Sequence, residues 1–297
     1  MSERVKTGTV MRGIGGFYSV ITPEGEAYSL RAQGKLRHER LSPLVGDRVD
    51  FVPGGEDEEG WLTAIHPRRN SLVRPAVANI DEIVLVVAPT SPQMDALLVD
   101  RLLIAASRAG IDASLLVNKS DLAPDEAARI ARQYEGAGIR VDRVCARTGE
   151  GIGRVRARLA GKTHAFGGQS GVGKSSLINA LYALTLETGN ISRKIERGKH
   201  TTRRCELIPV AGGGFVLDTP GFSLMETDLI EPARLADYYP EFAPYAGKCR
   251  FAPCYHVTEP DCAVRLALDE GRIAPERHER YRVLLDEMKE RWKNRYD

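Results

Sequence analysis

The stretch Gly168-Gln169-Ser170-Gly171-Val172-Gly173-Lys174-Ser175-Ser176 decides the fold of this 297-residue chain. It matches G-x-x-x-x-G-K-[ST], the loop that binds nucleotide phosphates, and the whole stretch is expected to line that site. Its glycines let backbone N–H groups point at an anion, and the helix N-terminus behind it adds partial positive charge. Lys174 is expected to reach the β and γ phosphates, and the Ser175 hydroxyl to bind Mg²⁺. A short strand at 164–167 and a helix from Ser175 give the motif the context that it requires.

A second motif, Asn118-Lys119-Ser120-Asp121, follows an apolar run at 113–117 and matches N-K-x-D. Its aspartate would accept hydrogen bonds from the N1–H and the N2 amine of guanine, which adenine does not supply. The wrong base would leave that buried acid unpaired, and this difference provides the selectivity. Downstream, Cys145-Ala146-Arg147 would add the Ala146 backbone N–H on guanine O6. Together these motifs predict a guanine-specific site.

A third motif, Asp218-Thr219-Pro220-Gly221, matches D-x-x-G. Asp218 is expected to hold Mg²⁺ through water, and the Gly221 N–H to sense the γ-phosphate. The three motifs indicate a GTPase, but in most GTPases the phosphate loop precedes the other two. A circular permutation explains the order, because the termini of compact domains often lie close together and new ones open in a loop. The segment after Gly221 then leads directly into the C-terminal region, which would be the first to feel its movement on hydrolysis.

The residues between the phosphate loop and D-x-x-G are strongly basic, with six Lys/Arg against one Glu over 191–204. Thr201 or Thr202 is expected to bind Mg²⁺ and the γ-phosphate, and the charges fit either an RNA contact or a mobile charged loop. Phe222 follows D-x-x-G, where a glutamine usually orients the attacking water. We therefore expect slow intrinsic turnover, on the order of 10⁻⁴ to 10⁻² per second. His200 is the candidate catalytic stand-in, and a loop histidine without a catalytic role is the alternative.

The C-terminal region carries Cys249-x4-Cys254-x-His256-x5-Cys262. Three thiolates and one imidazole are typical of a closed structural Zn²⁺ site with no open position for catalysis. The remaining cysteines, Cys145 and Cys205, are expected to be plain thiols. A long charged helix follows, and one apolar stripe on it is expected to pack on the rest of the domain: Tyr281, Leu284, Leu285, Met288 and Trp292.

The chain divides into three predicted domains: 1–70, 71–225 including a linker, and 226–297. Five short alternating runs in the first predict a small Greek-key barrel of the OB type. Ten basic and ten acidic residues over 1–70 balance, so an RNA-binding barrel and a purely structural one both remain open. The linker at 66–75 is expected to be extended and exposed, its arginines either touching phosphate or solvated. Alternating strands and helices from about residue 83 predict a doubly wound α/β domain, and the last domain is expected to be small and mostly helical.

Composition limits the location and the partners. The net charge is +2 with 28% charged residues, so a basic footprint for nucleic acid must be local. No apolar run reaches about 18 residues, and no secretion signal is evident, so a cytoplasmic protein without a membrane partner is expected. Five cysteines in that setting favour thiols or metal ligands over disulfides. Nothing in the sequence favours oligomerisation, and a monomer is expected.

Taken together, these motifs resemble the RsgA (YjeQ) family of circularly permuted GTPases that depend on the small ribosomal subunit. The resemblance extends over the whole chain. It implies an OB-fold N-terminal domain, slow GTP hydrolysis stimulated by the small (30S) subunit, and a role in late maturation of that subunit on its 16S rRNA. It also implies one Zn²⁺ on the Cys249, Cys254, His256 and Cys262 set, and GTP or GDP bound by 118–121 and 168–176. Arg203 stands where the family often has a third threonine, which leaves the choice between Thr201 and Thr202 open.

Two other functions are compatible with parts of the sequence. The first is an rRNA-binding assembly factor that GTP locks into shape, with incidental hydrolysis. The second is a P-loop kinase or ATPase, against which N-K-x-D argues.

Overall fold

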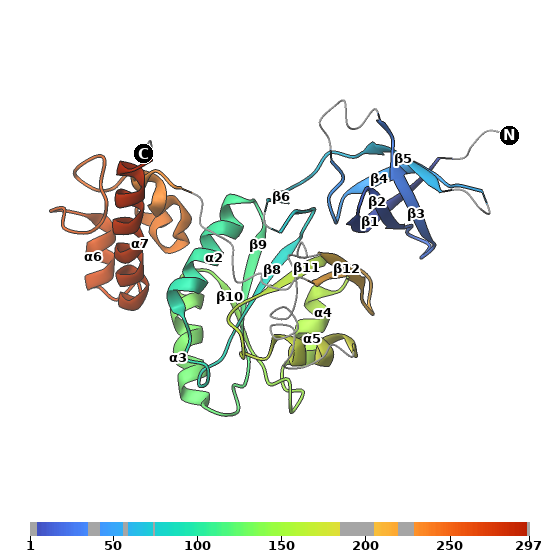
Figure 1. The fold of residues 1–297 in the computed structure, drawn as a ribbon. Coiled ribbons are helices and arrows are strands. Elements are labelled where there is room, and N and C mark those ends of the chain that lie inside the picture. Colours follow the sequence, from blue (N-terminus) through green and yellow to red (C-terminus); the bar gives the residue numbers. More distant parts are fainter. Residues whose placement is uncertain are drawn as a thin grey trace. The chain divides into compact units, whose positions relative to one another are not determined.

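The computed structural model describes residues 5–34, 42–55, 59–73, 75–184, 205–218 and 229–295. The N-terminal part is a closed five-stranded barrel, as the alternating runs predicted (Figure 1). Its strands are β1 (Lys6–Ile14), β2 (Phe17–Ile21), β3 (Ala27–Ala32), β4 (Arg48–Val52) and β5 (Gly60–Ile65), in the order β1-β2-β3-β5-β4. Alternate side chains along each strand point inward, so apolar residues from all five strands fill the interior: Val10, Val20, Leu30, Val49, Phe51 and Leu62.

The segment after the barrel contains a short hairpin of β6 (Ser71–Leu72) and β7 (Val77–Ala78). Arg68 is not a solvated linker residue, because its guanidinium donates to both carboxylate oxygens of the buried Asp47, at 2.7 and 2.8 Å. The sequence left open whether the linker arginines contact phosphate or are solvated. Arg68 does neither in this structure, because it forms a structural ion pair with Asp47. Arg69 similarly pairs with Asp81 at 2.7 Å.

The α/β part contains a six-stranded sheet in the order β10-β9-β8-β11-β13-β12. The first half of its chain supplies β8 (Glu82–Val87), α2 (Ala96–Arg108), β9 (Asp112–Val117), α3 (Pro124–Glu135), β10 (Arg140–Arg143) and α4 (Ile152–Leu159). The second half supplies β11 (Thr163–Gly167), α5 (Lys174–Tyr182), β12 (Glu206–Pro209) and β13 (Phe215–Asp218). β10 and β9 pair in parallel, as do β11 and β13, and β12 is antiparallel to β13.

The strand order reverses between β8 and β11. The chain proceeds outward from β8 to β9 and β10, and later crosses in the other direction from β11 to the edge strand β12, before β13 returns to lie between β11 and β12. In open α/β sheets, ligands bind beside the carboxyl ends of strands at such a reversal. The phosphate loop follows β11, so the permuted chain still places the loop at this point.

By compactness the chain divides into two units. One comprises Met1–Ile83, Ala157–Phe166 and Asn190–Phe222, and the other Val84–Arg156, Gly167–Gly189 and Ser223–Asp297. The phosphate loop, the N-K-x-D turn and the C-terminal region all belong to the second unit. Among the described residues, no helix is long and apolar enough to cross a membrane.

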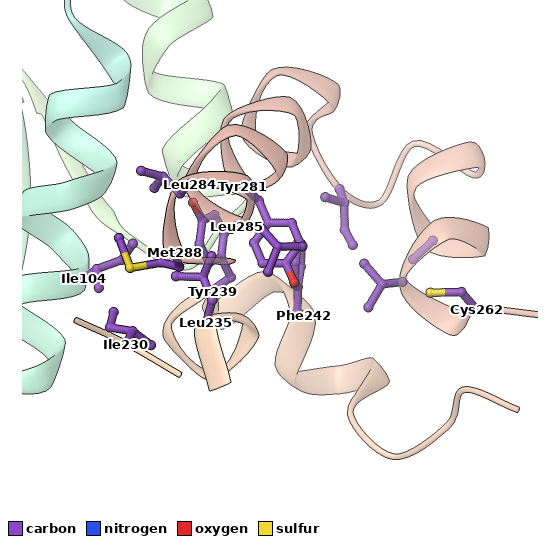
Figure 2. Close-up of a cluster of buried hydrophobic side chains, with 13 residues drawn as sticks. Ile104, Ile230, Leu235, Tyr239, Phe242, Cys262, Tyr281, Leu284, Leu285 and Met288 are labelled. Carbon is purple, nitrogen blue, oxygen red and sulfur yellow. The ribbon is translucent and has the colours of Figure 1, made fainter. Parts of the chain in front are cut away.

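The C-terminal region is mostly helical, as predicted. It consists of η2 (Pro232–Tyr238), η3 (Pro240–Tyr245), α6 (Ala263–Asp269) and α7 (Pro275–Lys293). Figure 2 shows its apolar cluster, which includes Tyr281, Leu284, Leu285 and Met288 of α7 and also Ile104 of α2. The predicted stripe is wrong at its last member, because Trp292 lies outside this cluster, with the Arg295 guanidinium 4.5 Å from its ring centroid.

Candidate nucleotide and zinc sites

The phosphate loop has a backbone that two of its glycines make possible. Gly168 has φ of 129°, and a Cβ there would lie 2.2 Å from the Val86 carbonyl oxygen. Gly173, immediately before α5, has φ of 92°, and a Cβ there would lie 2.5 Å from Nδ2 of Asn118. Both positions combine a left-handed backbone with a contact too close for any side chain. The motif glycines are therefore required for the loop to pack between β8 and the N-K-x-D turn.

Lys174 begins α5 and turns back over the loop. Its Nζ donates to the carbonyl oxygens of Gly168 and Gln169, at 2.7 and 2.6 Å. Burial lowers the pKa of Lys174 below its ordinary value, because desolvation disfavours the ammonium. Ser175 lies in the first turn of the same helix. A partly buried cation beside a helix N-terminus has the charge and the N–H donors that an anion-binding site requires.

Asn118, the first residue of N-K-x-D, contacts both the phosphate loop and the 145–147 turn. Its side chain is buried, with Nδ2 donating to the Val172 carbonyl at 3.0 Å and Oδ1 accepting from the Ala146 N–H at 3.1 Å. One amide therefore holds the phosphate loop on one side and the 145–147 turn on the other. The Ala146 N–H, which the sequence assigns to guanine O6, thus has Asn118 as its partner in this structure.

Lys119 adds a second tie to the phosphate loop. Its Nζ donates to the carbonyls of Gly171 and Ser91, at 2.9 and 2.8 Å, and its backbone is left-handed with φ of 59°. The 89–95 loop after β8 therefore belongs to the site as well. Sequence patterns did not identify Ser91, because its contact is through a backbone carbonyl that any residue provides.

Asp121, the expected guanine reader, lies against the 145–147 turn. The Arg147 guanidinium donates to its carboxylate at 2.7 Å. Hydrogen bonds from Arg147 and then Cys145 hold the pKa of Asp121 below its ordinary value. Ser120 fastens the same two turns, since its hydroxyl donates to the Val144 carbonyl at 2.9 Å. Sequence reasoning missed Arg147, although its place directly after Ala146 was a usable signal.

Several predicted site residues lie outside the described part of the chain: His200, Thr201, Thr202, Gly221 and Phe222. The basic segment 191–204 lies outside it as well. Asp218 is the last residue of β13, and its side chain is also outside the description.

The predicted zinc ligands form one cluster. The donor atoms of Cys249, Cys254, His256 and Cys262 all lie within 4.8 Å of one another. Sγ of Cys249 is 3.8 Å from Sγ of Cys262, and Nδ1 of His256 is 3.6 and 3.4 Å from those two sulfurs. A tetrahedral Zn²⁺ with bonds of about 2.3 Å to sulfur and 2.0 Å to nitrogen requires edges of about 3.8 and 3.5 Å. The donor set therefore fits Zn²⁺.

The loop that carries these ligands is organised by a residue that sequence patterns did not identify. The Glu259 carboxylate accepts backbone N–H groups from Tyr255, Val257 and Thr258, at 2.8 to 3.1 Å. Burial lowers the pKa of His256, which favours the neutral imidazole that a metal requires.

The chain is similar to known proteins over its full length. Residues 65–228 match the family model described as RsgA GTPase, and residues 7–62 match the RsgA N-terminal domain. Two relatives, each described as "Small ribosomal subunit biogenesis GTPase RsgA", come from Agathobacter rectalis and Geobacillus thermodenitrificans. They are 42% and 44% identical, and each alignment covers 97% of this chain and 99% of the relative.

Solved structures show the same likeness. The crystal structure of YjeQ from Thermotoga maritima has a TM-score of 0.84 at 34% identity, covering 96% of this chain and 99% of that one. The structure of YloQ, described as a circularly permuted GTPase, has a TM-score of 0.80 at 32% identity, covering 97% and 96%. The order of motifs, the arrangement of the sheet and these likenesses lead to one conclusion: the chain belongs to the RsgA GTPase family.

Proposed function

We propose that this protein is a GTPase that acts in biogenesis of the small ribosomal subunit. The observation that carries the proposal is the Asn118 side chain, which joins the phosphate loop and both guanine motifs at 3.0 and 3.1 Å. An anion cradle and a candidate guanine reader thus share one site, as a guanosine phosphate requires. Relatives described as small ribosomal subunit biogenesis GTPases match nearly the whole chain and supply the biological role.

In this proposal, different residues bind the phosphates, the guanine base and the Mg²⁺ that accompanies GTP. Residues 168–176 bind the phosphates through backbone N–H groups and Lys174, and Asp121 accepts the guanine N1–H and N2 amine. Arg147 then shares that carboxylate with the base, which the acceptor capacity of its two oxygens permits. Ser175, Asp218 and one of Thr201 and Thr202 would hold the Mg²⁺ that accompanies GTP, and Gly221 would contact the γ-phosphate.

Mg²⁺ neutralises charge on the transferred phosphoryl group when it is bound. The catalytic assignment remains His200, because a phenyl ring at Phe222 cannot orient water. Slow turnover of the isolated protein follows, and the small subunit would complete the site.

The zinc cluster has a structural role in the proposal. Cys249, Cys254, His256 and Cys262 would complete the coordination shell of one Zn²⁺ and leave no open position for catalysis.

Within the small subunit, the proposed binding partner is the 16S rRNA. The protein is proposed to act as a monomer in the cytoplasm. Domain boundaries near residues 70 and 225 separate barrel, GTPase and zinc-binding parts.

The proposal is tested by GTP turnover with and without purified small ribosomal subunits. Turnover is expected to rise by at least tenfold with subunits, and GTP is expected to displace labelled GDP far better than ATP does. Large subunits serve as the matched control. Equal competition by ATP would refute the guanine site. Tight subunit binding without stimulated turnover would instead favour the GTP-locked assembly factor.

A further inference from the structure

A hydrogen bond that serves no phosphate chemistry ties the phosphate loop to helix α2. Oε1 of Gln169 accepts from the Asp95 backbone N–H at 2.9 Å. Asp95 is also the N-cap of α2, because its Oδ1 accepts from the Leu98 N–H at 2.9 Å. Gln169 occupies a variable position of the motif, so its side chain is free to take on a second role.

Helix α2 is a stiff connector. Ala96–Arg108 contains neither glycine nor proline, and its 13 residues span about 20 Å. Whatever displaces its capped end is therefore transmitted along the helix rather than absorbed by a kink.

The middle of α2 is tied to the C-terminal helix α7 by buried charges. Asp100 is fully buried and accepts from Arg277 Nη1 and Arg280 Nε, each at 2.6 Å. The Arg277 guanidinium also donates to both oxygens of Glu241 in η3, at 2.7 and 3.2 Å. A group of one buried arginine, one partly buried arginine and two buried acids tolerates little displacement, because a separated charge would be left without its partner.

Other side chains of α7 then reach the zinc loop. Nε2 of His278 lies 2.8 Å from the His256 carbonyl oxygen, and the Tyr281 hydroxyl donates to the Tyr255 carbonyl at 2.9 Å. Ile104 of α2 packs in the same apolar cluster as Tyr281 (Figure 2). Direct contacts therefore run without a gap from the phosphate loop through α2 and α7 to a zinc ligand, within one compact unit.

We propose that α2 couples the phosphate loop to the zinc-binding region, so that nucleotide occupancy and order in that region stabilise each other. Gln169 is the positioning residue at the loop end, and Asp100 is its counterpart at the far end. The inference rests on the proposed function, because it takes the loop to be the GDP and GTP site. Coupling through α2 differs from coupling along the chain through residues 219–228, because the latter would not depend on Gln169.

The test measures hydrogen exchange in zinc-loaded, full-length protein with and without Mg²⁺ and GDP. In the native protein, GDP is expected to slow exchange about fivefold in peptides from 249–262 and 275–293, which is the lower end of the usual size of coupling between sites. Gln169→Met keeps the volume but removes the strong acceptor, so the slowing is expected to disappear at saturating GDP. Gln93→Met, an exposed residue near Asp95, is the matched control and should behave like the native protein.

Each result is decisive. Equal slowing in Gln169→Met and the native protein would overturn the inference and assign the coupling to the chain through 219–228. GDP binding without slowing in the native protein would also overturn it, while leaving the proposed function intact. Failure of the native protein to bind GDP would refute the proposed function instead.

A second variant tests the route from its other end. Because coupling is reciprocal, Asp100→Asn is expected to raise the GDP Kd about fivefold while zinc content stays stoichiometric. Glu279→Gln, in an exposed ion pair on the same α7, is its control. Combining Asp100→Asn with Gln169→Met should raise the Kd no further than the stronger single change, since both interrupt one route. Additive effects would contradict the shared route.

Discussion

At the scale of single residues, Asn118 and Lys174 have different roles in the proposed nucleotide site. Asn118 is buried and satisfied on both sides, so it fixes the positions of the phosphate loop and the 145–147 turn. Lys174 rests on two carbonyl oxygens and carries the charge. We expect Asn118 to contribute geometry and Lys174 to contribute phosphate affinity, and substitutions should separate the two effects.

Lys174→Met retains the length of the side chain and removes its charge. A hydrogen bond to a charged group contributes about 1.5–3 kcal/mol, so the GTP Kd is expected to rise roughly tenfold to a hundredfold. Calorimetric titration checks this, with Lys248→Met at an exposed position as the control. An unchanged Kd would show that the loop binds phosphate without this ammonium.

The pH dependence of GTP binding follows from the same residue. Burial lowers the pKa of Lys174, so the free protein loses this ammonium at a lower pH than an ordinary lysine would. Affinity should therefore fall as the pH rises through the lowered pKa, and binding there should take up a proton. Lys174→Met should lack this alkaline decline.

At the scale of elements, the loop with the proposed zinc ligands is expected to depend on the metal for its fold. Within 249–262 the Glu259 carboxylate holds three backbone N–H groups, and the four donor side chains lie together. Burial raises the pKa of Cys254 to about 12 in the metal-free protein. The Cys254 thiol must lose its proton to bind zinc as a thiolate. Zinc uptake should therefore release protons, and zinc affinity should increase with pH.

Cys254→Ser is expected to abolish stoichiometric zinc and to unfold the loop and α6, because structural zinc binding is folding free energy. The barrel should keep its fold, since its core draws on none of these residues. Zinc content and hydrogen exchange in 249–269 measure the two effects. Cys205→Ser, which alters a cysteine outside the cluster, should retain the metal, and retention by Cys254→Ser would disprove the ligand assignment.

At the scale of the whole molecule, the permuted chain order still produces the sheet that a nucleotide site requires. The strands on either side of the reversal come from opposite halves of the domain, β8 before the loop and β11 directly ahead of it. Helix α2 then contributes to two cores, since it flanks the sheet and its Ile104 packs in the C-terminal cluster. The second unit should therefore lose its fold as one body when the charges between α2 and α7 are disturbed.

Arg277→Met leaves Asp100 and Glu241 buried with one arginine fewer between them. Removing one partner of a buried ionic group costs about 3–5 kcal/mol, so the free energy of unfolding of the second unit should fall by about that amount. The chain has two tryptophans, so Trp61→Phe leaves Trp292 on α7 as the sole tryptophan, and its fluorescence reports on unfolding in urea titrations. Arg282→Met, in an exposed pair, should change stability by at most about 0.5 kcal/mol. A similarly small effect of Arg277→Met would contradict the buried-charge account.

Local patterns in the sequence determined much of this protein. The glycine-rich loop, the N-K-x-D turn, the Cys3His spacing and the alternating barrel strands were all readable, because each is a contiguous pattern with its own backbone requirement. The permuted order was readable too, since it is a property of the order of motifs. Arg68 and Trp292 were misjudged, because a pattern gives residue type and spacing but not the partner.

Only the tertiary structure decided which side chains meet. Asn118 and Val172 are 54 residues apart, Gln169 and Asp95 are 74 apart, and Arg277 and Asp100 are 177 apart. No periodicity links such positions. They come together because the sheet and the packing of α7 on α2 place them there, and burial then strengthens the charges and hydrogen bonds that join them.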